Sequence, residues 1–342
     1  MDKRRVGING FGRMGRLAMR AAFDRVDLEI VAINEPYASA ENMALLLEFD
    51  SVQGRWDKSC GASDDGQHIQ VDDQSIAFTQ FDAPKDIPWD RHDVDLVLEC
   101  SGQFRSFDSL KPHLDRGPKR VVVSCPVKGD PPNIVMGVNH DNFDLSSEAI
   151  VTAASCTTNC LAPIVRVLHD AIGIEHGLVT TIHNPTNTQS VHDAPHKDPR
   201  RARASQLSLI PTSTNSATAV TEIVPELRGK LDSIAVRAPV LNASICDCVF
   251  RVDRNTTVAE INRVLEAASN SSSLNGILGF ETRPLVSADF ARDPRSGIID
   301  ALSTRVTDHR LVKVLAWYDN EWGYANRLVE LAALVSSKST FE

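Results

Sequence analysis

A cysteine in a hydroxyl-rich segment is the most reactive feature of this sequence. Cys156 stands in Ala153-Ala-Ser-Cys-Thr-Thr-Asn-Cys160, directly after a short apolar strand expected at residues 149–152. Ser155 is a good helix N-cap residue, so Cys156 is predicted to lie in the first turn of a helix. The helix dipole would lower the pKa of a thiol there and favour a thiolate nucleophile. Pro163 argues against one straight helix from this point, because an interior proline kinks a helix.

A thiolate nucleophile needs a base or an ion-pair partner, and His183 is the candidate. It ends the apolar strand Leu178-Val-Thr-Thr-Ile182, and the ends of strands are where doubly wound folds place their chemistry. A lone cysteine is usually a buried small hydrophobic residue and a lone histidine is usually structural, so the two residues alone leave both interpretations open. Cys160, one helical turn beyond Cys156, is interpreted as a packing residue.

The segment Gly10-Phe-Gly-Arg-Met-Gly15 has the spacing of a dinucleotide-binding turn. It follows a strand expected at residues 4–9 and opens a helix expected at residues 13–25, which is the context that this spacing requires. The glycines permit a tight turn, close approach to a pyrophosphate and close helix–strand packing. Glu35 follows the next expected strand, at 28–33, where a carboxylate accepts from both ribose hydroxyls and repels a 2′-phosphate. The pattern predicts NAD; the alternative is a glycine-rich turn with a solvated glutamate.

Hydroxyl and cationic side chains gather after His183. Residues 184–203 combine threonines with four cations: Lys197, Arg200, Arg201 and Arg203. Such a cluster in an acidic chain indicates an anion site or a charged subunit contact, or else a solvated loop. Residues 211–217 resemble an anion-binding turn before a helix. Arg237 lies in an otherwise apolar strand, and a buried arginine needs an anionic partner such as a substrate phosphate.

The elements that must position these residues form two groups. In the first part, helical segments alternate up to about residue 153 with apolar strands expected at 4–9, 28–33, 94–98 and 120–124. In the later part, long polar loops separate strands expected at 178–182, 231–239, 243–252 and 312–318, with a helix at 257–268 capped by Thr256 and a closing helix around 330–335. The predicted fold class is α/β: a doubly wound parallel-sheet (Rossmann) NAD domain with a second, α+β catalytic domain.

Composition excludes several classes of function. The chain has 342 residues and a net charge of −9, so we expect no nucleic-acid partner and no binding to an anionic membrane surface. No apolar run is long enough to span a bilayer, and the first residues carry no signal-peptide pattern. The seven cysteines form no paired metal-binding motif. We therefore expect no metal and a reducing, cytoplasmic location.

Four segments resemble the glyceraldehyde-3-phosphate dehydrogenase family: Val6-Gly-Ile-Asn-Gly-Phe-Gly-Arg13, Ala154-Ser-Cys-Thr-Thr-Asn-Cys-Leu-Ala-Pro163, Pro225-Glu-Leu-Arg-Gly-Lys-Leu231 and Trp317-Tyr-Asp-Asn-Glu-Trp-Gly-Tyr324. They span nearly the whole chain in the family's order. The resemblance implies that Cys156 attacks the aldehyde carbon of glyceraldehyde 3-phosphate while His183 accepts the proton. Hydride transfer to NAD then leaves a thioester, which inorganic phosphate cleaves to an acyl phosphate.

The resemblance also assigns binding positions. For the C3 phosphate of the substrate it implies Thr186, Thr188 and Arg237, and for the attacking anion Ser155, Thr157, Thr214 and Asn215. For NAD it implies Asn9, Gly10, Phe11, Gly12, Arg13, Met14, Gly15, Glu35, Ser101, Gly102, Ser124 and Asn320. It implies a dinucleotide-binding domain made of 1–155 plus 320–342, a catalytic domain at 156–319, and a homotetramer with the 184–203 loop between subunits.

Some positions depart from the family's commonest pattern. Asn215 replaces a glycine of the anion site, Asp82 replaces an arginine near the adenine, and Asn184-Pro185 follows the histidine. Because asparagine tolerates left-handed backbone, the turn at Asn215 is expected to survive. Residues 193–203 and 296–304 resemble a subgroup that accompanies arsenate-resistance transporters, which implies arsenate as a second acyl acceptor.

Two other functions fit parts of the sequence. A relative acting on erythrose 4-phosphate hydrolyses its thioester with water, but the intact threonines and Arg237 favour attack by phosphate. A non-catalytic binding or regulatory protein on the same scaffold, contacting RNA, would be expected to lose Cys156 and His183, and the negative charge disfavours RNA.

Overall fold

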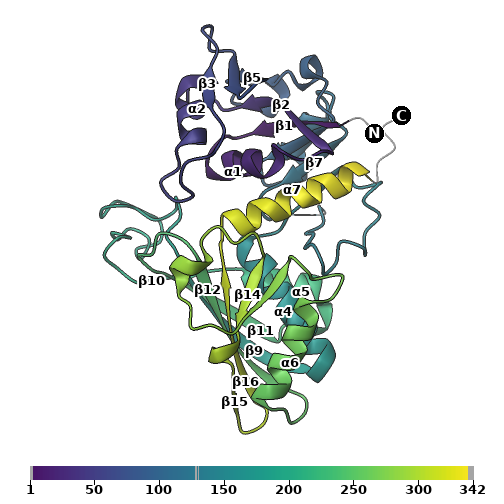
Figure 1. Ribbon diagram of the computed structural model, residues 1–342, viewed down its shortest axis with the longest axis vertical. Helices are drawn as coiled ribbons and strands as arrows, with labels where there is room; N and C mark the ends of the chain where they lie inside the picture. The colour runs from purple at the N-terminus through teal and green to yellow at the C-terminus, as the bar shows by residue number, and fades with distance from the viewer. Residues whose placement is uncertain (1–2, 128, 130, 338–342) are drawn as a thin grey trace. The chain divides into compact units, whose positions relative to one another are not determined.

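The computed structural model describes residues 3–127, 129 and 131–337 (Figure 1). The chain forms two compact units. The first comprises Met1–Met136, His140–Ala154 and Ala325–Glu342, and the second comprises Gly137–Asn139 and Ser155–Tyr324. The functional division drawn from the sequence, 1–155 with 320–342 and 156–319, stays a proposal. Among the described helices, none is long and apolar enough to cross a membrane.

The first unit is built on an eight-stranded sheet in the order β3-β4-β5-β2-β1-β6-β7-β8. Its strands are β1 Arg4–Asn9, β2 Leu28–Asn34, β3 Cys60–Ala62, β4 His68–Val71, β5 Gln74–Thr79, β6 Leu96–Glu99, β7 Arg120–Val123 and β8 Ile150–Thr152. From β5 to β8 every neighbouring pair is parallel, which confirms the doubly wound sheet. The antiparallel β3 and β4 extend one edge.

The parallel strands of the first unit are apolar because helices cover both faces of such a sheet. All four residues of β6 are buried, and Val97 packs in one cluster with Trp89, Leu110 and Val121. The helices are α1 Arg13–Ala22, α2 Ala40–Glu48 and α3 Phe107–Leu114, with short 3₁₀ turns at Pro84–Asp86 and Trp89–His92. The helix expected at 13–25 therefore ends earlier than predicted.

The second unit holds the sheet β10-β11-β9-β12-β16-β14-β13, with β15 paired to β16. Its strands are β9 Ile174–His183, β10 Ile210–Ser213, β11 Leu231–Arg237, β12 Ser244–Val252, β13 Leu278–Glu281, β14 Gly297–Asp300, β15 Arg305–Thr307 and β16 Leu311–Tyr318. Its helices are α4 Cys156–Ile172, α5 Ser216–Ile223 and α6 Val258–Ser269, and α7 Trp322–Ser337 begins in this unit; 3₁₀ turns lie at Pro225–Leu227, Ser287–Phe290 and Ala301–Ser303. Mixed strand directions agree with the α+β prediction.

Alternation along β9 gives the second sheet two different faces. Val179, Thr181 and His183 are buried, whereas Leu178 and Ile182 are exposed. Helix α4 contacts β9, β12 and β14 on the buried side (Figure 1). Because side chains alternate between the two faces of a strand, His183 lies on the same face as Val179 and Thr181, toward α4.

One predicted cap of the second unit is off by a residue. The N-cap of α6 is Thr257, whose side chain accepts from Glu260 N. Thr256 instead donates its hydroxyl to the Glu260 carboxylate at 2.8 Å. The two adjacent threonines are equally good caps by type, and only the start of the helix separates them.

A buried carboxylate, Glu99, holds together the carboxyl ends of β1 and β6, where the glycine-rich turn begins. Glu99, at the end of β6, accepts from Asn9 Nδ2 at 2.6 Å, from Ser101 N at 2.8 Å and from the Ser101 hydroxyl. His113 Nε2 lies 3.0 Å from Oε2, the same oxygen that accepts from Asn9. Trp89 Nε1 donates to His113 Nδ1 at 3.0 Å, so Nε2 carries the proton that Glu99 accepts.

Glu99→Ala is expected to lower the free energy of unfolding by about 3 kcal/mol, because the buried donors would lose their acceptor together. Urea unfolding followed by circular dichroism measures the loss. Glu41→Ala, at an exposed glutamate of α2, is the control and should change the unfolding free energy by less than about 0.5 kcal/mol. Equal effects of the two substitutions would show that the hydrogen bonds of Glu99 do not stabilise the carboxyl ends of β1 and β6.

Candidate active site

Helix α4 begins where the sequence predicts it. Ser155 is its N-cap, with Oγ accepting from Thr158 N at 3.1 Å, and Cys156 is its first residue. The preceding residue, Ala154, has a left-handed φ of 55°, which is strained for a residue with a Cβ. Pro163 lies inside α4, which continues to Ile172 with one side packed in the core, so the proline does not end the helix; whether it kinks the helix stays a prediction.

Cys156 and His183 meet directly. The distance from Sγ to Nε2 is 3.7 Å. His183 Nδ1 lies 2.7 Å from the backbone oxygen of Asn184, which can only accept. Arg237 Nη1, which can only donate, lies 2.7 Å from the same Nδ1, so the two contacts favour opposite tautomers and do not fix the position of the proton. Nε2 faces the thiol, and the histidine can act as a base toward Cys156 in the tautomer that carries its proton on Nδ1.

Burial sets the charge state of this pair. Burial raises the pKa of the Cys156 thiol, although the Thr157 hydrogen bond and the positive charge of Arg237 oppose it. Burial, followed by the charge of Arg237, lowers the pKa of His183 to about 3. The prediction that the helix terminus lowers the thiol pKa is wrong here, because desolvation outweighs it. The resting pair is a neutral thiol beside a neutral imidazole.

Arg237 is the cation of this site. The last residue of β11, it is paired with His183 in the parallel register of β9 and β11. Its Nη1 lies 2.7 Å from His183 Nδ1 and 3.3 Å from the oxygen of Asn184. Its Nε is buried without a hydrogen-bond partner, and no described carboxylate lies within ion-pair distance of it. A buried guanidinium in this state fits an anionic ligand, as the sequence predicts.

The predicted phosphate threonines lie beside a second arginine. Thr186 Oγ1 and Thr188 Oγ1 are 3.0 Å apart. Arg201 donates from Nη1 to Thr188 Oγ1 at 3.0 Å and from Nη2 to the oxygen of Ser213 at 3.3 Å. Arg201 thus joins the Thr188 segment to the chain next to Thr214. The basic cluster does not act as one group, since Arg203 pairs with Asp193 on the surface.

The turn before α5 carries the other anion position. Thr214 Oγ1 accepts from Ser216 N at 3.3 Å and lies 2.7 Å from the Ser216 hydroxyl, a residue that the sequence did not single out. Asn215 caps α5 without a side-chain hydrogen bond. Its φ is −102°, so the turn does not use the left-handed conformation that was invoked to explain the asparagine.

Tyr318 is a site residue that sequence reasoning missed. Its hydroxyl lies 2.7 Å from Thr181 Oγ1 and 3.0 Å from Thr157 Oγ1, and its ring meets His183 edge-on with centroids 6.0 Å apart. Thr157, assigned to the attacking anion, therefore turns its hydroxyl to Tyr318 here. The signal was present, because Tyr318 belongs to the tryptophan-containing segment at 317–324.

The glycine-rich turn borders a pocket of the first unit. A Cβ on Gly10 would lie 2.4 Å from the Ser101 backbone and one on Gly15 would lie 2.2 Å from the oxygen of Gly10, whereas the space before Gly12 is open. These are the turn, packing and ligand-approach roles expected of the three glycines. The pocket lining comprises Asn9, Gly10, Gly12, Glu35, Pro36, Tyr37, Phe81, Asp82, Cys100, Ser101, Gln103 and Phe104.

The other predicted cofactor residues lie outside that lining. Phe11 is buried in the core, and its backbone N–H donates to Glu35 Oε2 at 2.8 Å, which fixes that carboxylate at the pocket. Arg13 forms an ion pair with Asp50 at 2.9 Å. The remaining positions are Met14 and Gly15 in α1, Gly102 and Ser124 after β6 and β7, and Asn320 in the second unit. The open cradle at Gly12 and the carboxylate of Glu35 fit a dinucleotide.

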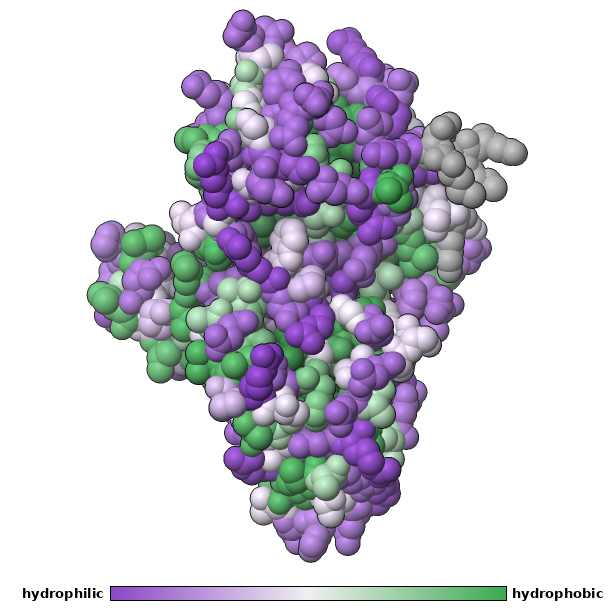
Figure 2. Space-filling view, in the orientation of Figure 1, coloured by the Kyte–Doolittle hydropathy of each residue, from purple (hydrophilic) through white to green (hydrophobic). Residues whose placement is uncertain are grey.

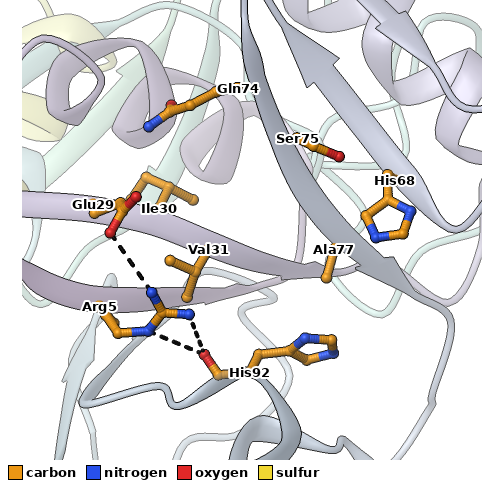
Figure 3. A pocket seen from close by; sticks show the side chains of 9 residues that line it. All are labelled: Arg5, Glu29, Ile30, Val31, His68, Gln74, Ser75, Ala77 and His92. Carbon is orange, nitrogen blue, oxygen red and sulfur yellow. Dashed lines mark hydrogen bonds and ion pairs between the residues drawn. The ribbon is translucent and has the colours of Figure 1, made fainter.

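A second pocket lies near the start of β1, away from the glycine-rich turn (Figure 3). Arg5 Nη2 donates to the oxygen of His92 at 2.9 Å, and Nη1 lies 3.7 Å from Glu29. Burial lowers the pKa of His92. Because the pocket's cation is already engaged, the site has no free charge to hold a ligand, and we assign it no function.

Comparison with known proteins matches both units. The model described as glyceraldehyde 3-phosphate dehydrogenase, NAD binding domain, matches residues 4–107, and that of the C-terminal domain matches residues 155–320. Glyceraldehyde-3-phosphate dehydrogenase 3 of Nostoc sp. is 59% identical over 98% of both chains. The dehydrogenase of Geobacillus stearothermophilus is 45% identical and dehydrogenase 2 of Bacillus subtilis is 44% identical, each over 98% of both chains.

Arg237→Ala should raise the pKa of Cys156 further and bring that of His183 back toward its usual value, because one positive charge acts on both. The rate of Cys156 alkylation by iodoacetamide, followed across pH by peptide mass spectrometry, should shift to higher pH. Arg251→Ala, which removes a partly exposed arginine of β12, is the control. An unchanged profile in Arg237→Ala would show that this charge does not reach the thiol.

Proposed function

The chain belongs to the glyceraldehyde-3-phosphate dehydrogenase family, and we propose that Cys156 and His183 carry out its NAD-dependent oxidation of glyceraldehyde 3-phosphate. The product is 1,3-bisphosphoglycerate when phosphate is the acyl acceptor. The observation that supports this assignment most directly is the 3.7 Å contact between Cys156 Sγ and His183 Nε2 at the first turn of α4.

The side chains account for the chemical steps. The Cys156 thiol passes its proton to His183 Nε2 as Sγ attacks the aldehyde carbon and forms a thiohemiacetal. Backbone N–H groups of the first helical turn have no intrahelical acceptor, so the N–H of Cys156 can donate to the developing oxyanion. NAD, when bound, would supply the hydride acceptor that the oxidation of the thiohemiacetal to a thioester requires. Attack of the inorganic anion on the thioester carbon then releases the acyl phosphate and frees Sγ.

Two anion subsites follow from the assigned positions. Arg237, with Thr186 and Thr188, binds the C3 phosphate, and its unpartnered buried Nε supports this role. The attacking anion is held by Ser155, Thr157, Thr214 and Asn215. Thr157 would exchange its bond to Tyr318 for the anion. Arsenate has the same shape and charge as phosphate, so the same subsite would accept it and give 1-arseno-3-phosphoglycerate.

The cofactor site favours NAD. Asn9, Gly10, Gly12 and Ser101 line the pocket, and Phe11, Arg13, Met14, Gly15, Gly102, Ser124 and Asn320 complete the assignment. Glu35, fixed by the N–H of Phe11, places a carboxylate where a 2′-phosphate would be repelled.

All seven cysteines are free thiols, which supports a cytoplasmic location.

Formation of NADH at 340 nm tests the reaction, with glyceraldehyde 3-phosphate and NAD in the presence of phosphate, arsenate or no added anion. We expect turnover that requires an anion. Cys156→Ser should lower kcat about a thousandfold or more, because the hydroxyl is a much poorer nucleophile. Cys60→Ser, at a thiol of β3 in the first unit, is the matched control.

Each contrary result has a distinct meaning. Equal rates without an anion would indicate hydrolysis of the thioester, as in relatives that act on erythrose 4-phosphate. No turnover by folded, reduced protein with either anion would refute the assignment of Cys156 or of the substrate. Retained activity in Cys156→Ser would refute the nucleophile alone.

We further propose that the chain is a homotetramer. The sheet face of the second unit that α4 leaves uncovered carries Leu178 (66% exposed), Ile182 (39%) and Ile234 (43%). Figure 2 shows further apolar side chains on the loop that precedes β10, where Leu207 and Leu209 are exposed. Apolar side chains gathered on an uncovered sheet face are typical of subunit interfaces.

Leu178→Asp with Ile234→Asp should dissociate the tetramer into smaller species, because two unpaired charges on a sheet face that the tetramer would bury cost several kcal/mol. Sedimentation velocity measures the outcome. Val26→Asp, at a side chain 85% exposed in the first unit, is the control and should leave the assembly unchanged. A wild-type protein that sediments as a monomer at micromolar concentration would refute the proposal.

A further inference from the structure

Two groups compete for one ring nitrogen of His183. The oxygen of Asn184 and Nη1 of Arg237 each lie 2.7 Å from Nδ1. The carbonyl oxygen can only accept a hydrogen bond and the guanidinium can only donate one, so the Nδ1 of a neutral imidazole satisfies one of them and not both. The choice also sets the state of Nε2, 3.7 Å from Cys156 Sγ, because Nε2 is a base only while Nδ1 carries the proton.

The oxygen of Asn184 and the imidazole are both fixed by their neighbours. The backbone N–H of Asn184 donates to Ser244 Oγ at 3.3 Å, and its side-chain Nδ2 donates to the oxygen of Leu241 at 3.2 Å. His183 ends β9, a strand that pairs with β11 and β12, and its ring meets that of Tyr318 edge-on. The carbonyl and the imidazole therefore cannot separate without breaking other contacts.

The position of Arg237 favours one tautomer in the resting arrangement. With the proton on Nε2, Nη1 can donate one hydrogen to Nδ1 and its second to the oxygen of Asn184, 3.3 Å away. With the proton on Nδ1, two N–H groups would face each other across 2.7 Å. A charged donor also forms the stronger hydrogen bond. The resting arrangement thus favours the tautomer in which His183 is not a base toward the thiol.

The guanidinium of Arg237 is the member of this group that can move. Its backbone is held, since Ala238 N donates to the oxygen of His183 at 2.8 Å. Its long side chain has several rotatable bonds, and its Nε is buried without a hydrogen-bond partner. A phosphate group would give that nitrogen an acceptor and form charge-assisted hydrogen bonds with the guanidinium. An anion can therefore draw Nη1 away from Nδ1.

We propose that Arg237 sets the tautomer of His183 and that the phosphate group of the substrate switches it. Without an anion, Nη1 donates to Nδ1, the proton is on Nε2, and His183 cannot accept the proton of Cys156. When a phosphate binds Arg237, Nε2 gives its proton to water, and Nδ1 takes one up from water and donates it to the oxygen of Asn184. The ring stays neutral and Nε2 becomes the base. The inference rests on the proposed function, which assigns Arg237 to the C3 phosphate.

The switch makes the base available only to a phosphorylated substrate. An aldehyde that lacks the phosphate meets a histidine whose proton faces the thiol, so Sγ stays protonated. The phosphate then contributes to the rate of thiol attack and not only to binding affinity.

Magic-angle-spinning NMR of protein labelled with ¹⁵N histidine measures the tautomer, because the two ring nitrogens of a neutral imidazole are chemically distinct. A His183→Gln sample identifies the signals of His183 among those of the ten histidines. We expect anion-free wild type to carry the proton on Nε2 by about ten to one, the ratio that one hydrogen bond supplies. Glycerol 3-phosphate, which has the phosphate but no aldehyde, should reverse the ratio, and glycerol should not.

Two variants separate the contact with His183 from the charge of the site. Arg237→Ala should place the proton on Nδ1 with and without glycerol 3-phosphate, because Asn184 is then the only partner of Nδ1. Arg201→Ala is the matched control, since it removes a positive charge beside the predicted phosphate threonines. Arg201 donates to Thr188 and to the oxygen of Ser213, so its loss should leave the anion-free tautomer on Nε2.

Three results would overturn the inference. They are a proton on Nδ1 in anion-free wild type, the same anion-free tautomer in wild type and Arg237→Ala, and a tautomer that glycerol 3-phosphate leaves unchanged in wild type. Failure of the proposed function would appear separately, as an absence of NADH formation from glyceraldehyde 3-phosphate in protein whose tautomers follow the expectation.

Discussion

The phenol of Tyr318 joins the two elements that carry the proposed chemistry. Its hydroxyl bonds Thr157, which follows the nucleophile on α4, and Thr181, two residues before the base on β9. A helix and a strand packed only by apolar contacts can slide by fractions of an ångström. A buried hydroxyl with two fixed partners resists this, because any shift would leave polar groups unpaired. The contact between Cys156 and His183 thus depends on a residue that touches neither sulfur nor imidazole nitrogen.

Burial shifts the pKa values of both Cys156 and His183 in the direction that keeps each group neutral. It raises the pKa of the thiol and lowers that of the imidazole, so neither group is charged at neutral pH in the resting site. Arg237 supplies the nearby positive charge, and its own pKa is lowered by burial. A substrate anion that neutralises Arg237 would remove the charge that disfavours protonation of His183. Substrate binding would in this way prepare the base to receive the thiol proton.

The sequence predicted correctly those features of the site that depend on a few adjacent residues. The cap at Ser155, the first-turn position of Cys156 and the glycine-rich turn each depend on a few adjacent residues, and the structure has them. The role of Tyr318 depends on strand order, since β16 and β9 flank β12, and no short segment encodes that order. The thiol pKa was predicted in the wrong direction for the same reason: the helix terminus is local, whereas burial comes from the whole second unit.

The parallel register of β9 and β11 has a consequence for how this chain can change in length. Arg237 lies beside His183 because the two strands pair residue for residue from Leu231 with Gly177. Inserting one residue within either strand would turn every later side chain to the opposite face, so that the guanidinium or the imidazole would leave the site. The connection between the strands carries no such register constraint, although it holds Thr186, Thr188 and Thr214 of the proposed anion sites. Deletions of one residue inside β9 or β11 should therefore be absent from any active relative, whereas changes in length within the connection are compatible with the site wherever they leave those threonines in place.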